Sequence, residues 1–261
     1  MSEESNLTYV PSKNPAHVEI LDQLRAHDPK SIILVALGPC TNLALALAED
    51  PETFHRAQRI IIMGGAVRHV GNMTPGAEFN IYGDPDAAEQ IFNLSSPSRE
   101  KTPYGRIHVA LVPLDVTTYQ TLTDKTFNEY VKPLLEQKRP LAAFLSDVLS
   151  RSFEKITRYS GKPQVGCHDP LTIYSLLHPE SMVWETLDVR VETDGKWTRG
   201  QTVMDNRGVA KWKPGEKGVI RDCGDWLHGD SGTAIDVLVS SGGEPDGFGL
   251  KLLDGIFGRC G

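Results

Sequence analysis

The sequence lacks several features that mark common classes of protein. Its four cysteines, Cys40, Cys167, Cys223 and Cys260, form no CxxC pair, which argues against a structural zinc site or a small disulfide scaffold. No apolar run approaches the ~20 residues that a membrane-spanning helix needs, and no signal peptide is visible among the first residues. We therefore expect reduced thiols in a soluble, cytoplasmic protein that has no membrane partner.

The sequence also has no excess of positive charge. It contains 27 Lys and Arg against 34 Asp and Glu, a formal net charge of -7. A nucleic-acid-binding surface needs a basic patch, so we expect no nucleic-acid partner. Two catalytic motifs are missing as well. No GxSxG segment supplies a serine nucleophile, and Gly64, Gly65 and Gly71 do not have the GxGxxG spacing of a dinucleotide-binding turn.

What the sequence does contain is an alternation of apolar strands and helices. Residues 1–16 are polar and are expected to form a loop, and a helix is predicted over 17–25. Continuous apolar runs predict strands buried on both faces of a sheet over 31–38, 59–65 and 106–114. Helices are predicted between them over 42–50, with Thr41 as the N-cap, and over 84–93, with Asp84 and Pro85 suited to its start. This order predicts one α/β domain over 1–261, with a Rossmann-like, mostly parallel central sheet and flanking helices.

The second half of the chain is predicted to be helical first and mixed afterwards. Helical spacing of apolar residues covers 124–137, 140–161 and 168–180. Short alternating runs over 184–212, centred on Asp194 and Gly195, predict a small β-hairpin insertion. A strand-like piece over 217–223 is followed by predicted helices over 229–240 and 247–257.

Ligands of open α/β sheets usually bind beyond the carboxyl ends of the strands. Three polar segments fall there: the turn at Leu37, the Gly-rich loop after Met63, and the helix start at His168 and Asp169. Asp115 also follows a strand, but we expect it only to begin the next turn.

The Gly-rich loop contains Asn72, Glu78 and Asn80. A carboxylate with two carboxamides suits the vicinal hydroxyls of a sugar, which need several fixed donors and acceptors. Glu78 and Asn80 are two positions apart, so both would point the same way in an extended segment. The alternative is an ordinary Asn/Gly/Pro surface loop without a ligand.

The helix start at His168 and Asp169 also has two interpretations. In the first, Asp169 is an N-cap followed by Pro170, a common helix opening that needs no ligand. In the second, Asp169 is a hard oxygen ligand for Ca²⁺ and His168 is an acid that protonates a leaving group.

Five segments together resemble one family. VALGPCTNLALAL, RIIIMGGAVRHVGNMTPGAEFNIYGDPDAA, LVPLDVTTYQTLT, CHDPLTIYSLLHPE and RGQTVMD are similar, in order and spacing, to motifs of the inosine-uridine-preferring nucleoside hydrolases. The resemblance runs from about residue 17 to about residue 207.

The resemblance implies an enzyme that uses Ca²⁺ to hydrolyse ribonucleosides to ribose and a free base. It implies that the Leu37 carbonyl and the Asp169 carboxylate bind the metal. Asn72, Glu78 and Asn80 would hold the ribose hydroxyls, and Met63 would line the ribose pocket. His168 would face the leaving base, and Glu78 would stabilise positive charge on the ribose. Family members are usually dimers or tetramers, which implies a homo-oligomer, whereas the base preference is not implied.

One family motif has no counterpart in this sequence. Members begin with a strand that carries a DTDPGxDD-like segment, whose aspartates bind Ca²⁺ and activate the attacking water. No such segment occurs here, so we expect the N-terminal strands of the family domain to be absent and the calcium site to be incomplete. We expect no measurable hydrolysis by this chain. The alternatives are an incomplete copy of an active enzyme, a non-catalytic relative or partner subunit that binds nucleoside or ribose, and a remnant without function.

Overall fold

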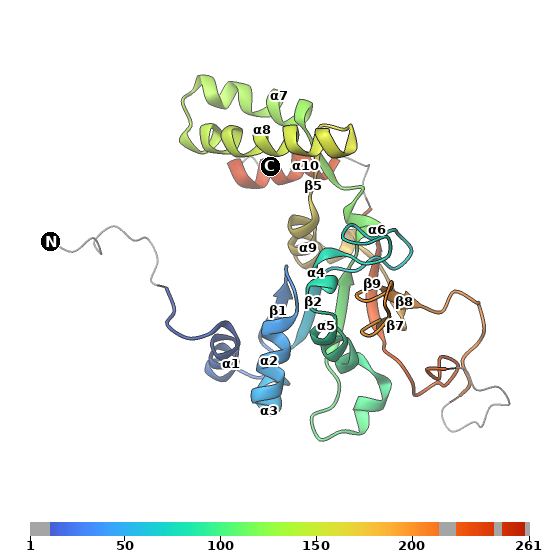
Figure 1. The fold of residues 1–261 in the computed structure, drawn as a ribbon. Coiled ribbons are helices and arrows are strands. Elements are labelled where there is room, and N and C mark those ends of the chain that lie inside the picture. The colour runs from blue at the N-terminus through green and yellow to red at the C-terminus, as the bar shows by residue number, and fades with distance from the viewer. Residues whose placement is uncertain (1–10, 214–222, 243–246, 259–261) are drawn as a thin grey trace.

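The computed structural model describes residues 11–213, 223–242 and 247–258. Its centre is a five-stranded sheet in the order β1-β2-β3-β9-β6 (Figure 1). The first four of these strands in sheet order run parallel, and β6 pairs antiparallel with β9. The strands are β1 (Ile33–Ala36), β2 (Arg59–Met63), β3 (His108–Val112), β9 (Ile235–Ser240) and β6 (Val183–Leu187). The predicted mostly parallel α/β sheet is therefore confirmed.

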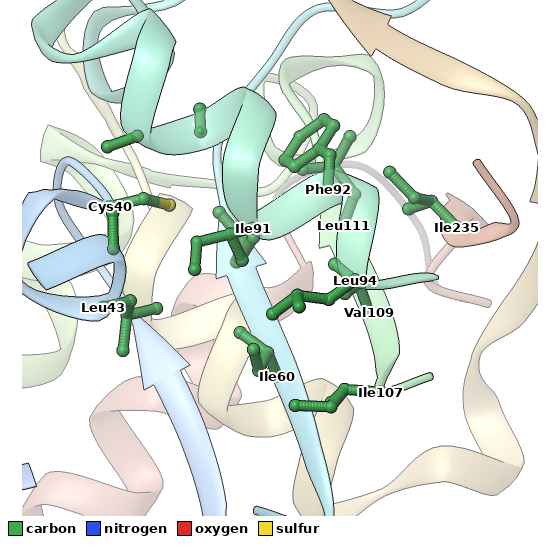
Figure 2. Close-up of a cluster of buried hydrophobic side chains, with 14 of the residues drawn as sticks. Cys40, Leu43, Ile60, Ile91, Phe92, Leu94, Ile107, Val109, Leu111 and Ile235 are labelled. Carbon is green, nitrogen blue, oxygen red and sulfur yellow. The ribbon is translucent and has the colours of Figure 1, made fainter. Parts of the chain in front are cut away.

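Alternate residues of the central strands point into two separate hydrophobic cores. Ile60 and Ile62 of β2 pack in one core, whereas Ile61 packs in the other. Figure 2 shows the first core, where Ile60 and Ile91 lie between the strands and the helix above them. A parallel sheet covered on both faces explains why β2 and β3 are nearly continuous apolar sequences.

Helices cover both faces of the sheet. The first core contains side chains of α1 (Ala16–Ala26), α2 (Thr41–Glu49), α3 (Pro51–Phe54) and α5 (Pro85–Phe92). The second core contains side chains of α7 (Asp124–Glu136), α8 (Pro140–Ser160), α9 (His168–Leu177) and α10 (Gly247–Phe257). In Figure 1, α7, α8 and α10 lie together beyond one end of the sheet. The remaining helical segments are α4 (Phe79–Gly83), α6 (Leu114–Thr117), η2 (Asn93–Ser95), η3 (Pro97–Lys101) and η4 (Pro179–Ser181).

Two short antiparallel pairs complete the described chain. One joins β4 (Thr121–Thr123) to β5 (Gln164–Gly166). The other joins β7 (Val189–Val191) to β8 (Thr202–Met204) on either side of Asp194 and Gly195, which confirms the predicted hairpin around these residues. The start of the predicted segment, 184–187, belongs instead to β6 of the central sheet. No helix of the described chain is both long enough and apolar enough to cross a membrane.

Three sequence-based predictions of the fold were wrong. The segment 229–240 is not a helix, because 235–240 forms strand β9, whose β-branched Ile235, Val237 and Val239 fit a pleated, half-buried surface. Strand β1 is not buried on both faces, because it is the edge of the described sheet and all four of its residues are half-buried. Thr41 is not the N-cap of α2, because the helix begins at Thr41 and Cys40 precedes it.

Other predictions are confirmed or lie outside the described residues. Asp84 is the N-cap of α5 and accepts a hydrogen bond from the Ala87 amide, as its place before Pro85 predicted. The strand-like piece over 217–223 lies outside the described residues except for Cys223. The loop predicted over 1–16 is likewise described only from residue 11, and α1 begins at Ala16. The single domain over 1–261 stays a prediction.

Candidate functional site

The predicted site residues meet at the carboxyl edge of β1 and β2. These strands pair in parallel with Ala36 opposite Ile62, so Leu37 and Met63 follow at the same level of the sheet. Helix α9 contacts β2, and its first residues are His168 and Asp169. Helix α4 supplies Asn80 and is preceded by Glu78. The sheet therefore gathers residues from four separate segments at one edge, where ligands of such sheets usually bind.

Glu78 is buried at this edge and binds backbone amides. It is the N-cap of α4, and its Oε2 accepts hydrogen bonds from Ile81 N at 3.1 Å and Gly65 N at 3.0 Å. Burial raises the pKa of Glu78, hydrogen bonds from the backbone amides oppose this, and the Asp169 charge raises it further. No positively charged group is among these contacts to stabilise the ionised carboxylate. Oε2 is thus already engaged by two backbone amides.

Asn80 and Met63 form one hydrogen-bonded unit. Asn80 Nδ2 donates to the Met63 carbonyl oxygen at 3.0 Å and lies 3.3 Å from Met63 Sδ. Both residues are buried. This contact orients the carboxamide so that its Oδ1 is the atom left for a ligand. The prediction that Asn80 and Glu78 lie in one extended segment was wrong, since Asn80 lies inside α4, but the structure still brings both side chains to the same edge.

Asn72 lies on the exposed part of the Gly-rich loop. Its Oδ1 accepts a hydrogen bond from Phe79 N at 2.9 Å, at the start of α4. The loop is closed on itself by backbone hydrogen bonds from Gly71 to Pro75 and from Met73 to Ala77. Asn72 therefore holds the loop against the helix, and its side-chain amide nitrogen makes no hydrogen bond within the described chain.

Two residues without a predicted site role fix the loop just after β2. The Asp115 carboxylate accepts hydrogen bonds from Val67 N at 2.8 Å and Arg68 N at 2.6 Å. The Thr202 hydroxyl binds both backbone polar atoms of Ala66. Asp115 therefore does more than begin a turn, because its carboxylate holds the backbone of this loop. The sequence offered one sign of Thr202, because it lies in the RGQTVMD motif, but no pattern there indicated its partner.

His168 is half-buried and held by a threonine that sequence reasoning missed. His168 Nδ1 lies 2.7 Å from Thr117 Oγ1, in α6. Burial lowers the pKa of His168, and the neighbouring Asp169 carboxylate acts in the opposite direction. Lowering favours the neutral imidazole near neutral pH. Thr117 lies in the LVPLDVTT segment, yet nothing in that segment showed that it reaches a residue 51 positions later.

Asp169 is not the N-cap of α9. The helix begins at His168, Cys167 is the preceding residue, and neither supplies a side-chain cap. The Asp169 carboxylate is exposed in the first turn and has no hydrogen-bond or ion-pair partner among the residues that the structure covers. The capping interpretation of Asp169 was therefore wrong, and this carboxylate is available to an external group. A helix N-terminus favours a negative charge at this position.

The described residues provide only part of a divalent-cation site. Asp169 carries a carboxylate, and Leu37, an exposed residue, follows the end of β1. Hard oxygens of these kinds suit Ca²⁺, but the ion prefers 6–8 of them. Within the described ranges, no three His, Cys, Asp or Glu side chains come together as a metal site. The donors that this part of the chain brings to the edge are therefore too few to fit Ca²⁺ by themselves.

A family model described as inosine-uridine preferring nucleoside hydrolase matches residues 2–223 of the chain. The match covers the sheet edge, the Gly-rich loop, α9 and the hairpin with Thr202. It therefore includes all the residues that were predicted for the site.

The chain is also similar to individual members of that group. It is 35% identical over 184 residues to the probable uridine nucleosidase 1 of Oryza sativa subsp. japonica, which covers 70% of this chain and 52% of that protein. It is 36% identical over 199 residues to the pyrimidine-specific ribonucleoside hydrolase RihA of Klebsiella pneumoniae, covering 74% of this chain and 57% of that protein. The chain thus spans about half the length of the curated relatives that it matches.

Among solved structures, the fold is similar to a plant nucleoside hydrolase. The two share 28% sequence identity with a TM-score of 0.68, over 91% of this chain and 67% of the plant chain. The similarity of the fold therefore extends over nearly the whole of this chain.

Proposed function

Because the chain belongs to the inosine-uridine preferring nucleoside hydrolase family, we propose that its sheet edge is part of a site that hydrolyses ribonucleosides to ribose and a free base. The observation that carries this proposal is the meeting of Glu78, Asn80 and Asp169 at one edge, beside the Thr117-supported His168. Polar groups with fixed orientations suit the diol of a ribose, and an imidazole beside them suits a departing base.

The electrostatics of the edge favour a cationic ribose. Breaking an N-glycosidic bond builds positive charge on the sugar, as in other glycoside hydrolyses with an oxocarbenium-like transition state. Glu78 is buried, and the Asp169 charge is close enough to raise its pKa. Positive charge that develops beside these two carboxylates is stabilised more strongly than the neutral sugar, which is the condition for lowering the barrier.

Each remaining residue has a narrower role. Asn80 offers Oδ1 to a ribose hydroxyl, because Met63 holds its Nδ2. Asn72 offers its side-chain amide from the loop, because its Oδ1 is bound to Phe79. His168 donates to or protonates the leaving base. Oxygen donors of these kinds suit a hard cation such as Ca²⁺, and Asp169 and Leu37 are the described groups that would contact it.

The small donor set favours a second function for this chain by itself. Two oxygen donors fall short of a calcium site, and within the described residues no three His, Cys, Asp or Glu side chains gather to hold a metal ion. We therefore propose that the isolated chain binds ribonucleosides without hydrolysing them. Turnover would then need further oxygen ligands, from a partner subunit or from other protein segments.

Ligand binding tests the first part of this proposal. Nuclear magnetic resonance titration of the chain with inosine or uridine should give saturable shifts, and the 2′,3′-dideoxy analogues should give none. Asn80→Ala should abolish the shifts. Asn128→Ala, an exposed asparagine on α7, is the matched control and should leave them unchanged. Equal shifts with the dideoxy analogues would overturn diol recognition at this edge.

Hydrolysis of p-nitrophenyl riboside tests the second part. The isolated chain should show no release of p-nitrophenol above background, with or without Ca²⁺. Release that is lost in Asp169→Ala would instead show that the chain carries a complete catalytic site.

A further inference from the structure

Within the described residues, the Thr117 side chain makes one hydrogen bond, and its partner is His168. Thr117 is fully buried, with 0% of its surface exposed, and its Oγ1 lies 2.7 Å from His168 Nδ1. The two residues come from different elements, since Thr117 ends α6 and His168 begins α9, and these helices contact each other. The contact therefore ties the imidazole to the element that follows β3.

The direction of this hydrogen bond follows from the surroundings of Thr117. A threonine hydroxyl carries one proton, and a buried hydroxyl proton without an acceptor is unfavourable because it has lost its hydrogen bond to water. Nδ1 is the only acceptor that the structure gives this hydroxyl among the described residues. If Nδ1 carried the proton instead, the threonine proton would be left unpaired in the interior. The lower-energy arrangement has Thr117 donating to Nδ1, which puts the proton of the neutral imidazole on Nε2.

Gly166 provides the space in which the imidazole lies. A Cβ at this glycine would lie 2.4 Å from His168 Nε2 and 2.9 Å from Cε1. Gly166 is in β5 and does not have a positive φ, so glycine is needed there for space and not for backbone conformation. Thr117 on one side and Gly166 on the other therefore restrict the ring to one orientation.

We propose that Thr117 is a positioning residue that fixes His168 as the Nε2–H tautomer. His168 then presents a hydrogen-bond donor to its ligand. If the function proposed above holds, this favours leaving bases that offer an acceptor to Nε2–H, such as a purine ring nitrogen or a pyrimidine carbonyl oxygen. The tautomer itself depends on Thr117 and does not depend on that function.

Nitrogen-15 spectroscopy of the imidazoles tests the tautomer directly, in the chain without substrate. Long-range ¹H–¹⁵N correlation distinguishes a protonated from an unprotonated ring nitrogen, at about pH 8, where an unperturbed imidazole is neutral. The sequence has eight histidines, and His168→Gln identifies the signals of His168 by their loss. The expected result is a protonated Nε2 and an unprotonated Nδ1. A protonated Nδ1 in the wild-type chain would overturn the proposal, whatever the variants do.

Two threonine variants separate positioning from packing. Thr117→Val keeps the shape and removes the donor, so His168 should change to a mixture of tautomers. Thr117→Ser restores the hydroxyl and should restore the wild-type spectrum. If Thr117→Val folds and leaves the His168 signals unchanged, the hydroxyl does not set the tautomer.

A pair of glycine variants tests the space around the ring. Gly166→Ala should displace the imidazole and shift the His168 signals. Gly255→Ala, on α10, places its new Cβ where no heavy atom lies within 4 Å and should leave those signals unchanged. Wild-type His168 signals in Gly166→Ala would contradict the assigned orientation. Because these spectra need neither substrate nor turnover, a failure of the chain to bind inosine or uridine in the titration remains a separate result.

Discussion

The Thr202 hydroxyl binds both backbone polar atoms of Ala66. It accepts from Ala66 N at 3.0 Å and donates to Ala66 O at 2.8 Å, across a sequence separation of 136 residues. Strand β8 is thereby attached to the loop that follows β2. Gly65 fits beside it with a φ of 79°, and a Cβ there would lie 3.0 Å from Thr202 Cγ2. The hairpin therefore fixes the backbone at Ala66, next to Gly65, whose amide donates a hydrogen bond to the Glu78 carboxylate.

Thr202→Val should destabilise the protein by about 1–3 kcal/mol, because it leaves a buried amide and a buried carbonyl of Ala66 without partners. Chemical denaturation followed by circular dichroism measures this change. Thr202→Ser keeps the hydroxyl and should lose less stability. A larger loss in Thr202→Ser than in Thr202→Val would mean that packing of the methyl group, and not hydrogen bonding, carries the effect.

The described cysteines should differ strongly in reactivity. Burial raises the pKa of Cys40 to about 12, with further contributions from the charges of Asp84 and Glu78. Burial also raises the pKa of Cys167 to about 11. The thiolate is the reactive form, so both should resist alkylation in the native protein, whereas the exposed Cys223 should react. Peptide mass spectrometry after native and denatured labelling with iodoacetamide checks this order. Native labelling of Cys40 at the rate of Cys223 would contradict the packing of α2 against α5.

Asp188 should stabilise the protein in a pH-dependent way. Burial opposes its ionisation, but hydrogen bonds from Arg190 and Lys211 outweigh burial, and the pKa of Asp188 is lowered from 3.8. A carboxyl whose folded pKa is lower than its unfolded pKa contributes stability above the unfolded value, and this contribution is lost as the pH falls below it. Asp188→Asn should therefore cost about 1.5–3 kcal/mol at neutral pH, and the difference from wild type should shrink below about pH 4.

An exposed ion pair provides the control for Asp188. Asp86 pairs with Arg199, and its side chain is 60% exposed. Asp86→Asn should change the free energy of unfolding by less than about 1 kcal/mol. If the cost of Asp188→Asn were the same at pH 3 and at pH 7, the ionised form of Asp188 would not be the source of its stability.

The sequence predicted strands β1, β2 and β3 well, because their apolar runs are local patterns. The runs that became β1, β2 and β3 and the Asp84-Pro85 helix start depend on neighbours in the chain. The predictions failed where the local structure depends on contacts with residues far away in the sequence. Segment 235–240 pairs with β3 and β6, which no local window shows. The roles of Thr117 and Thr202 depend on partners 51 and 136 residues away. Resemblance located the candidate site residues, and the structure added what holds them.

The donor set at the sheet edge leads to the last prediction, which concerns calcium. Asp169 and Leu37 supply two oxygens where Ca²⁺ prefers 6–8, so we expect the isolated chain to bind the ion no more tightly than about 1 mM. At about 1 mM Ca²⁺ the stabilisation would then be at most about 0.4 kcal/mol. The unfolding temperature should be the same in Ca²⁺ and in chelator, and Asp169→Asn should not alter this result. A clear rise in unfolding temperature with Ca²⁺ that disappears in Asp169→Asn would mean that the chain completes the site with donors beyond the described edge. It would also remove the reason for expecting binding without hydrolysis.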